Sequence, residues 1–410
     1  MMAFRLLAGA MMPSLEMAVF SVHKLFGLRI GVCDVQKMLL FRAVFGAPLA
    51  LVNVYSLRSR DCRCWSIFDV RETMKAVCLS APGEIALVDL PEQRRGRDEV
   101  LIRVRSAGIC GSDIGAYKGV NPLVSYPRII GHEVAGEVVE VAPDETLFKV
   151  GERVIIEPYV YCGKCYPCSI GHTNCCEHLT VRGVHIDGGM AEYISHPRHL
   201  LHKVPEGIPW HLAPLAEPLV IAMHAVRQAE VKAGQHVVIT GAGQIGLFAA
   251  QYALTLGAIP VIVDPVDARL SLAHALGVAH TLNPTGADVL AAIQTLTQGR
   301  MAEAVIECSG AAPAIRSALD YVSYAGYIAL VGWPKAEISL PTALFTKKEL
   351  TVRGSRNSVG QFPESLRLIA EGKIDVGALL TCTVPLAETP AIVADISEHP
   401  EKYLKVTCVF

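Results

Sequence analysis

Four cysteines near residue 170 have the residue type and spacing of metal ligands. Cys162, Cys165, Cys168 and Cys176 follow the pattern C-x2-C-x2-C-x7-C. Glycine, lysine, tyrosine and proline lie between them, whereas reduced core cysteines would be scattered over hydrophobic faces. The spacing therefore predicts a tetrahedral zinc site. Because four protein ligands leave no position for water or substrate, we expect this zinc to hold structure and to do no chemistry.

Cys175 directly precedes Cys176 and complicates the ligand set. Successive side chains of an extended segment point to opposite sides, so only one of the two can close the tetrahedron. The spacing does not choose between them.

A thiolate, an imidazole and a carboxylate elsewhere have the composition of a second, open zinc site. Cys110 lies in the segment GICGSD, His132 and Glu133 lie in GHE, and Glu217 begins EPL. Each has an ordinary alternative, as a core cysteine, a turn histidine or an acid at a helix N-terminus. Three protein ligands leave the fourth position of zinc free for a substrate hydroxyl, whose pKa the metal lowers as a Lewis acid. We expect Cys110, His132 and Glu217 to form the working metal site.

A glycine-rich segment between two predicted strands matches the fingerprint of dinucleotide binding. It follows the strand HVVIT, opens a predicted helix and comprises Gly241, Ala242, Gly243, Gln244, Ile245 and Gly246. Gly241 permits a tight turn, Gly243 lacks the side chain that would block the pyrophosphate, and Gly246 lets helix and strand pack closely. The phosphates would lie at the helix N-terminus, where free N–H groups and the helix dipole favour negative charge.

Asp264 ends the next strand and indicates which dinucleotide binds. A carboxylate there accepts hydrogen bonds from the ribose hydroxyls and repels a 2′-phosphate, so we expect NAD in preference to NADP. Arg269 weakens this inference, because a guanidinium can assist a phosphate. Its alternatives are packing near the adenine or pairing with Asp264 or Asp267.

Composition and patterning predict two domains in a soluble globular chain of 410 residues, 51% hydrophobic and 19% charged. From Met74, short strands alternate with glycine and proline turns, which is typical of an all-β module. From about His236, the order strand, glycine turn, helix, strand predicts an α/β fold with a doubly wound parallel sheet. A net charge of −2 argues against a nucleic-acid partner, and thirteen cysteines without a secreted framework favour a cytoplasmic location.

Residues 1–73 differ in composition from the rest of the chain. Their apolar runs are interrupted by Glu16, Lys24 and Arg42 before they reach the ~20 residues that a membrane span needs, so we expect no transmembrane helix. A signal or transit peptide is an alternative, but no small-residue cleavage site follows the first apolar run. We expect an over-extended start or a poorly ordered appendage.

Taken together, these segments resemble the zinc-containing medium-chain alcohol dehydrogenases. GICGSD, GHE followed by Gly136, the four-cysteine segment, EPL and GAGQIG occur in that order in the family, and the resemblance covers Met74 to Phe410. Glu217 stands where many alcohol dehydrogenases carry a cysteine, so the chain looks most like the polyol and sugar-acid branch, with its sorbitol and threonine 3-dehydrogenases. SYPRIIGHE, TNCCE, GVHIDGG, EPLVIAMHAVR and RGSRN look closer still to the L-galactonate 5-dehydrogenase type.

The resemblance implies a GroES-like catalytic domain made of residues 74–220 and 355–410, with the structural zinc lobe at about 160–178. A Rossmann domain, residues 221–354, would be inserted between the two pieces, and the active site would lie in the cleft. Related enzymes are dimers or tetramers, so the resemblance also implies a homo-oligomer.

The resemblance also assigns the metal ligands, with two zinc ions per chain. Cys110 and His132 would bind the catalytic zinc, with Glu217 a direct or water-mediated third ligand and Glu133 a supporting or exchangeable one. Cys176, and not Cys175, would complete the closed site.

Ser112 falls where the family places the hydroxyl that takes the first proton from the substrate. The family's proton relay often continues through a histidine five residues after the cysteine ligand, but Gly115 occupies that position here. The relay would therefore run through the cofactor ribose, through water or through another histidine such as His185.

Arg356 and Asn357, in GSRN, fall where related polyol dehydrogenases place an arginine near the substrate. A guanidinium suits a carboxylate, so a hexonate such as L-galactonate would fit better than a neutral polyol. Sorbitol-like polyols and threonine are the alternative substrates. The competing interpretation is that Arg356 pairs with a structural acid or anchors its loop.

Two other classes of protein explain less of the sequence. A zinc-free quinone or enoyl reductase on the same scaffold would lack GHE and the four-cysteine segment. A zinc module that binds nucleic acid would need a basic surface and would have no dinucleotide site. The sequence therefore favours a zinc-dependent, NAD-linked dehydrogenase that acts on a small molecule.

Overall fold

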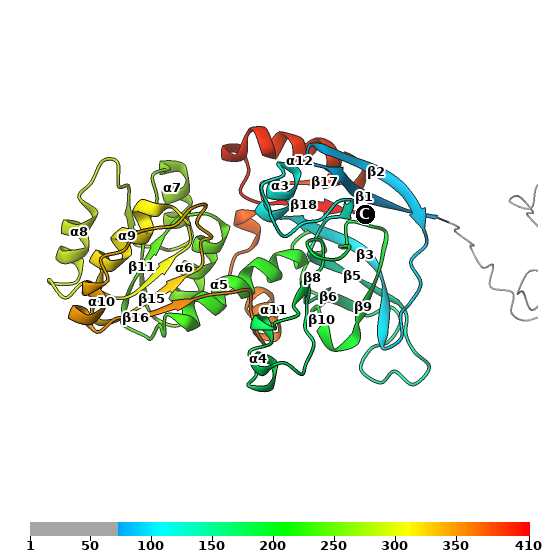
Figure 1. Cartoon of the computed structure of the whole chain (residues 1–410), viewed down its shortest axis with the longest axis horizontal. Coiled ribbons are helices and arrows are strands. Elements are labelled where there is room, and N and C mark those ends of the chain that lie inside the picture. The colour runs from blue at the N-terminus through cyan, green and yellow to red at the C-terminus, as the bar shows by residue number, and fades with distance from the viewer. Residues whose placement is uncertain (1–72) are drawn as a thin grey trace, which may run out of the picture. The chain divides into compact units, whose positions relative to one another are not determined.

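The structure, a computed structural model, describes residues 73–410 (Figure 1). The expectations for residues 1–73 therefore lie, apart from Thr73, outside the described residues. Within residues 73–410, no helix is both long enough and apolar enough to cross a membrane.

The first part of the described chain is built of β-strands, as the alternating pattern from Met74 predicts. The largest sheet has seven strands in the order β10-β6-β5-β3-β18-β17, with β9 also paired to β3. A three-stranded sheet has the order β2-β1-β4, and β7 pairs with β8. The strands are β1 (Thr73–Ala81), β2 (Glu84–Pro91), β3 (Glu99–Ile109), β4 (Arg128–Ile129), β5 (Glu133–Glu140), β6 (Arg153–Ile156), β7 (Tyr159–Val160), β8 (Thr180–Val181), β9 (Tyr193–Pro197), β10 (Leu201–Lys203), β17 (Cys382–Pro385) and β18 (Val406–Val409).

The second part holds a six-stranded parallel sheet of order β13-β12-β11-β14-β15-β16. In chain order this is 3-2-1-4-5-6, the order of a doubly wound dinucleotide-binding sheet. The sheet order reverses between β11 and β14, and ligands bind outside the carboxyl ends of the strands at such a point. The strands are β11 (His236–Thr240), β12 (Ile259–Val263), β13 (His280–Leu282), β14 (Ala302–Glu307), β15 (Val322–Leu330) and β16 (Thr351–Gly354).

Helices cover both faces of the parallel sheet, because successive strand residues point to opposite sides. Val237 and Ile239 of β11 pack into one core with α5, α6 and α7, whereas Val238 packs into another with α8 and α9. The helices are α3 (Gly111–Tyr117), α4 (Tyr166–Ser169), α5 (Ala216–Gln228), α6 (Gln244–Thr255), α7 (Asp267–Ala275), α8 (Val289–Leu296), α9 (Ala312–Tyr321), α10 (Ala343–Lys348), α11 (Phe362–Ala370) and α12 (Thr389–Glu398).

The end of the chain returns to the first sheet. β18 pairs antiparallel with β3, so that Val406 lies opposite Ile109. Helix α5 contributes to the core under the parallel sheet and also, through Ala216 and Val220, to a core with Ile155 and Phe362. The predicted fold class, a Rossmann sheet inserted in a GroES-like all-β domain, is confirmed.

Candidate active site

Strand pairing brings together three of the predicted ligands of the open site. β3 and β5 pair antiparallel with Gly108 opposite Glu133. Cys110, just after β3, therefore lies beside His132 and Glu133, at the start of β5. The three ligand atoms all lie within 4.8 Å of one another, and the histidine and the glutamate are buried.

Asp113, which the sequence analysis did not single out, supports this group from the first turn of α3. Its Oδ2 accepts a hydrogen bond from the Cys110 amide at 2.9 Å, and its Oδ1 lies 3.8 Å from Nδ1 of His132. A carboxylate behind a metal-binding histidine fixes the orientation of the ring and raises its basicity. The spacing Cys-x-x-Asp in GICGSD was the available sequence signal.

Lys405, also missed from the sequence, is fully buried beside Glu133. Its Nζ donates hydrogen bonds to Glu133 Oε1 and, at 3.1 Å, to the Ile109 carbonyl. This lysine lies 272 residues from its partner and reaches it only because β18 joins β3. No local sequence signal marks it.

Glu217 lies in the first turn of α5 with 1% of its surface exposed. It is not part of the close group, and its Oε1 accepts a hydrogen bond from the hydroxyl of Tyr159. Burial raises the pKa of the Glu217 carboxyl to about 7. The sequence analysis ranked Glu217 above Glu133 as a ligand, whereas the structure groups Glu133 with the cysteine and the histidine.

The charges and the unpartnered atoms of this cluster fit a divalent cation. Asp113, Glu133 and Glu217 are buried near the half-buried Cys110 thiol, and the ammonium group of Lys405 donates a hydrogen bond to Glu133. Although burial lowers the pKa of His132, the neighbouring Cys110 and Asp113 raise it well above its usual value. Four buried atoms have no hydrogen-bond partner: Asp113 Oδ1, His132 Nδ1, Glu133 Oε2 and Glu217 Oε2. Such orphaned buried groups are costly unless a ligand satisfies them.

Ser112 lies at this cluster, with its Oγ 3.4 Å from Nε2 of His132. Gly115 is part of α3 and offers no side chain for a relay. His185 accepts a hydrogen bond from the Val181 amide at 3.0 Å, and burial and then the charge of Arg356 lower its pKa. Among the described residues, His185 makes no hydrogen bond to Ser112.

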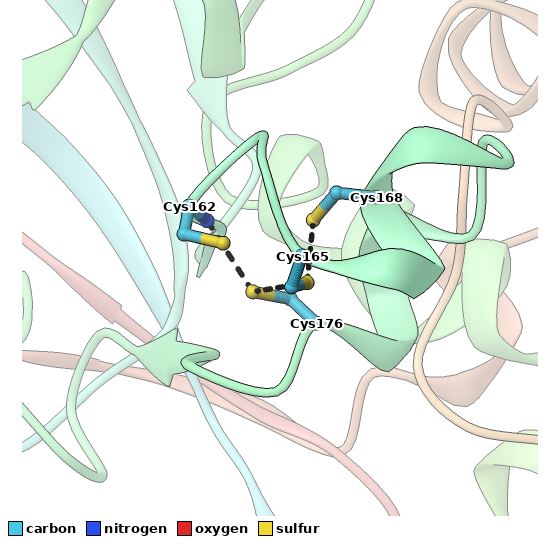
Figure 2. A group of neighbouring side chains, drawn as sticks. All are labelled: Cys162, Cys165, Cys168 and Cys176. Carbon is cyan, nitrogen blue, oxygen red and sulfur yellow. Dashed lines mark hydrogen bonds between the residues drawn. The ribbon is translucent and has the colours of Figure 1, made fainter.

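The four predicted zinc cysteines converge in one loop (Figure 2). Their sulfur atoms all lie within 4.8 Å of one another, and Cys165 Sγ is 3.4 Å from Cys168 Sγ. Cys176 is buried with its thiol in this group, whereas Cys175 is exposed and outside it. Two main-chain amides donate to Cys176 Sγ, each at 3.3 Å, as suits a thiolate.

The glycine-rich turn has the geometry that a pyrophosphate needs. Gly241 has a φ of +96°, which favours glycine, and a Cβ on Gly246 would lie 1.8 Å from the Gly241 carbonyl oxygen. A Cβ on Gly243 would meet no atom within 4 Å. Gln244 and Ile245 begin α6, whose N-terminus therefore opens beside unfilled space.

Asp264 follows β12 and is tied to this turn. Its Oδ2 accepts from the Ala242 amide at 2.7 Å and its Oδ1 from the Val266 amide at 2.8 Å. Each carboxylate oxygen keeps a lone pair for a further donor. Within residues 73–410 Arg269 pairs with neither Asp264 nor Asp267, and Asp267 accepts from Asn283 instead.

Arg356 follows β16 in a segment that returns toward the four-cysteine loop. Its carbonyl accepts a hydrogen bond from Asn174 Nδ2 at 2.7 Å. Its exposed guanidinium makes no hydrogen bond and no ion pair with any described residue. Within residues 73–410, Arg356 therefore forms no pair with a structural acid, which was one part of the competing interpretation.

Comparison with known proteins decides the family. Residues 96–206 match the alcohol dehydrogenase GroES-like domain, and residues 245–371 match the zinc-binding dehydrogenase domain. A zinc-type alcohol dehydrogenase-like protein of Haemophilus influenzae, itself uncharacterised, is 52% identical over 83% of this chain and 100% of its own. The chain belongs to the zinc-containing medium-chain alcohol dehydrogenases.

This dehydrogenase is thus an oxidoreductase acting on CH–OH groups. The L-galactonate-5-dehydrogenase of Escherichia coli is 38% identical over 77% of this chain and 93% of its own. The crystal structure of the alcohol dehydrogenase rspB from E. coli CFT073, complexed with NADH, superposes with a TM-score of 0.78 at 31% identity. It covers 83% of this chain and 100% of its own.

Proposed function

We propose that this dehydrogenase oxidises a secondary hydroxyl of a sugar acid or polyol to the ketone with NAD, and that a hexonate such as L-galactonate is its best substrate. The observation that carries the reaction class is the close group of Cys110 with the buried His132 and Glu133, near the buried Glu217. We propose these residues as the holders of a catalytic zinc, with Glu217 a direct or water-mediated third ligand and Glu133 a supporting or exchangeable one. When bound, zinc supplies the Lewis acidity that lowers the pKa of an alcohol.

The chain's own residues then take three tasks. Ser112, 3.4 Å from His132, would take the proton that the substrate hydroxyl loses and pass its own proton on, through the cofactor ribose or through water. Asp113 orients the histidine, and Lys405 neutralises and positions Glu133. The four-cysteine loop holds a second, structural zinc.

NAD is the proposed cofactor rather than NADP. The Asp264 carboxylate is buried at the glycine-rich turn, where it would repel a 2′-phosphate. Arg269, which pairs with no described residue, favours NADP instead. Parallel assays with both cofactors test this: a higher kcat/KM for NADP would contradict it.

The substrate proposal is supported by the unpaired Arg356 guanidinium and by the likeness to an L-galactonate dehydrogenase. The experiment is NAD reduction across a panel that contains L-galactonate, other hexonates, L-threonine, sorbitol and simple alcohols. We expect the highest kcat/KM for a hexonate. A kcat/KM for sorbitol or L-threonine above that for every hexonate would make that compound the proposed substrate in place of the sugar acid. No turnover at all would contradict the proposed function.

Arg356→Met tests the carboxylate directly. We expect kcat/KM for a hexonate to fall by at least about tenfold, since a charge-assisted hydrogen bond contributes about 1.5–3 kcal/mol, while a neutral polyol is little affected. Arg367→Met is the matched control, because Arg367 is a surface arginine whose one ion pair with a described residue is to Glu371. Equal losses on hexonate and polyol would exclude carboxylate binding by Arg356.

A cytoplasmic location and a homo-oligomer complete the proposal. The described cysteines are all free of disulfides, as expected in a reducing compartment. The edge strand β16 has Val352 exposed, and edge strands are sites of pairing with another chain. Light scattering on the purified protein tests the assembly, and the mass of a single chain would contradict it.

A further inference from the structure

A buried polar cluster joins three segments that lie far apart in the sequence. At its centre is His224 of α5, 5% exposed. Its Nε2 lies 3.4 Å from Asn174 Nδ2 and 3.2 Å from Gln228 Nε2, and its Nδ1 lies 3.4 Å from Gln361 Nε2. Burial, and then the charge of Arg227, lower the pKa of His224 to about 4, so the ring is neutral. The cluster therefore joins the four-cysteine loop, the helix that carries Glu217 and the segment after β16.

Asn174 is the member that reaches the Arg356 segment directly. It is 2% exposed and lies in the short turn Thr173–Cys175, two residues before Cys176. Its Nδ2 donates to the Arg356 carbonyl at 2.7 Å, and its Oδ1 is buried without a partner. A buried amide with one strong bond is placed by that bond, because losing it would leave two polar groups unsatisfied.

The segment that Asn174 holds has few other attachments. The Ser355 amide donates to the Leu330 carbonyl at 2.8 Å, and the Val359 amide donates to Gln361 Oε1 at 2.6 Å. Between these two points, the bond from Asn174 to Arg356 is the only hydrogen bond to another described residue. The guanidinium pairs with no described residue. The position of the Arg356 side chain therefore depends on the hydrogen bonds of the main chain around it.

We propose that Asn174 is a positioning residue for substrate recognition: its amide fixes the main chain of Arg356, so that the guanidinium is presented to the carboxylate of a sugar-acid substrate. The inference rests on the proposed function. It gives the closed four-cysteine loop, which does no chemistry, a role in specificity, because the turn that completes that loop also holds the specificity arginine.

The test compares Asn174→Ala with Arg356→Met and with the double variant on a hexonate and on a neutral polyol. We expect Asn174→Ala to raise KM for the hexonate by about tenfold and to change kcat little. The KM and kcat for the polyol should stay nearly unchanged. In the Arg356→Met background, Asn174→Ala should add no further loss on the hexonate, since the two act through one contact. A purely structural defect would instead lower kcat/KM for both substrates alike, and its effect would add to the loss from Arg356→Met.

Zinc content and thermal unfolding show whether Asn174→Ala still folds. If it does not, Gln361→Met, which removes the neighbouring attachment at Val359, should give the same selective rise in KM. Equal losses on hexonate and polyol, or additivity in the double variant, would overturn the positioning role. If Arg356→Met is itself unselective, the carboxylate proposal fails; if it is selective and Asn174→Ala is not, only the positioning role fails.

Discussion

At the scale of single residues, the candidate site is a cluster in which buried acidic side chains outnumber the basic ones. Three carboxylates and the Cys110 thiol lie near His132, and the ammonium of Lys405 donates to one of the carboxylates, Glu133. Isolated ions are costly to bury, so such a cluster is stable only when a cation or protons neutralise it. A zinc site explains the cluster, including the two carboxylate oxygens of Glu133 and Glu217 that lack partners.

Ser112→Ala tests the proton transfer. Ser112 is the hydroxyl at His132, so we expect its removal to lower kcat by about 10²-fold, the usual size of acid-base assistance. Zinc content should stay unchanged, because the serine is not a proposed ligand. Ser80→Ala, at an exposed position of β1, is the control. A fully active Ser112→Ala enzyme would remove this residue from the mechanism.

The residues missed in the sequence differ in how they could have been found. Asp113 lies three residues from Cys110, and a carboxylate at that spacing is a readable local signal. Lys405 depends on a strand pairing between distant segments, which no local pattern reveals. The choice between Glu133 and Glu217 is likewise tertiary, because it follows from Glu133 standing opposite Gly108 across two strands.

At the scale of elements, two glycines of the glycine-rich turn have different roles, since Gly246 serves the folding of the turn and Gly243 serves cofactor binding. Gly246 packs α6 against the turn, since a Cβ there would lie 1.8 Å from a carbonyl oxygen, whereas Gly243 faces open space. The strand HVVIT and the helix that begins within GAGQIG could be predicted from the sequence. A buried parallel strand, a glycine turn and an apolar helix each have a strong local signature.

The pair Gly243→Ala and Gly246→Ala tests this division. We expect Gly243→Ala to keep the thermal stability of the cofactor-free protein and to raise the KM for NAD by at least about tenfold, or ~1.4 kcal/mol. Gly246→Ala should lower the melting temperature even without cofactor, because the turn must shift. Unchanged NAD affinity in Gly243→Ala would show that the pyrophosphate binds elsewhere.

At the scale of the whole molecule, the order of the motifs along the chain could be predicted from the sequence. Their meeting in space could not. Segments around residues 110, 132 and 217 meet because β3 pairs with β5 and because α5 contributes to two cores. The sequence analysis inferred this meeting from the residue types and from a resemblance, but residue spacing alone did not require it. The structure adds the supports, such as Lys405 from the last strand and Asn174 from the four-cysteine loop.

The central claim is that an open zinc site does the chemistry and a closed one holds structure. It is tested most directly by the zinc content of the purified chain, measured beside its rate of NAD reduction. We predict about two zinc ions per chain in the wild type and about one in Cys110→Ser, with activity lost together with the first ion. A wild type with one zinc or none, or a Cys110→Ser variant that keeps its activity, would contradict the account.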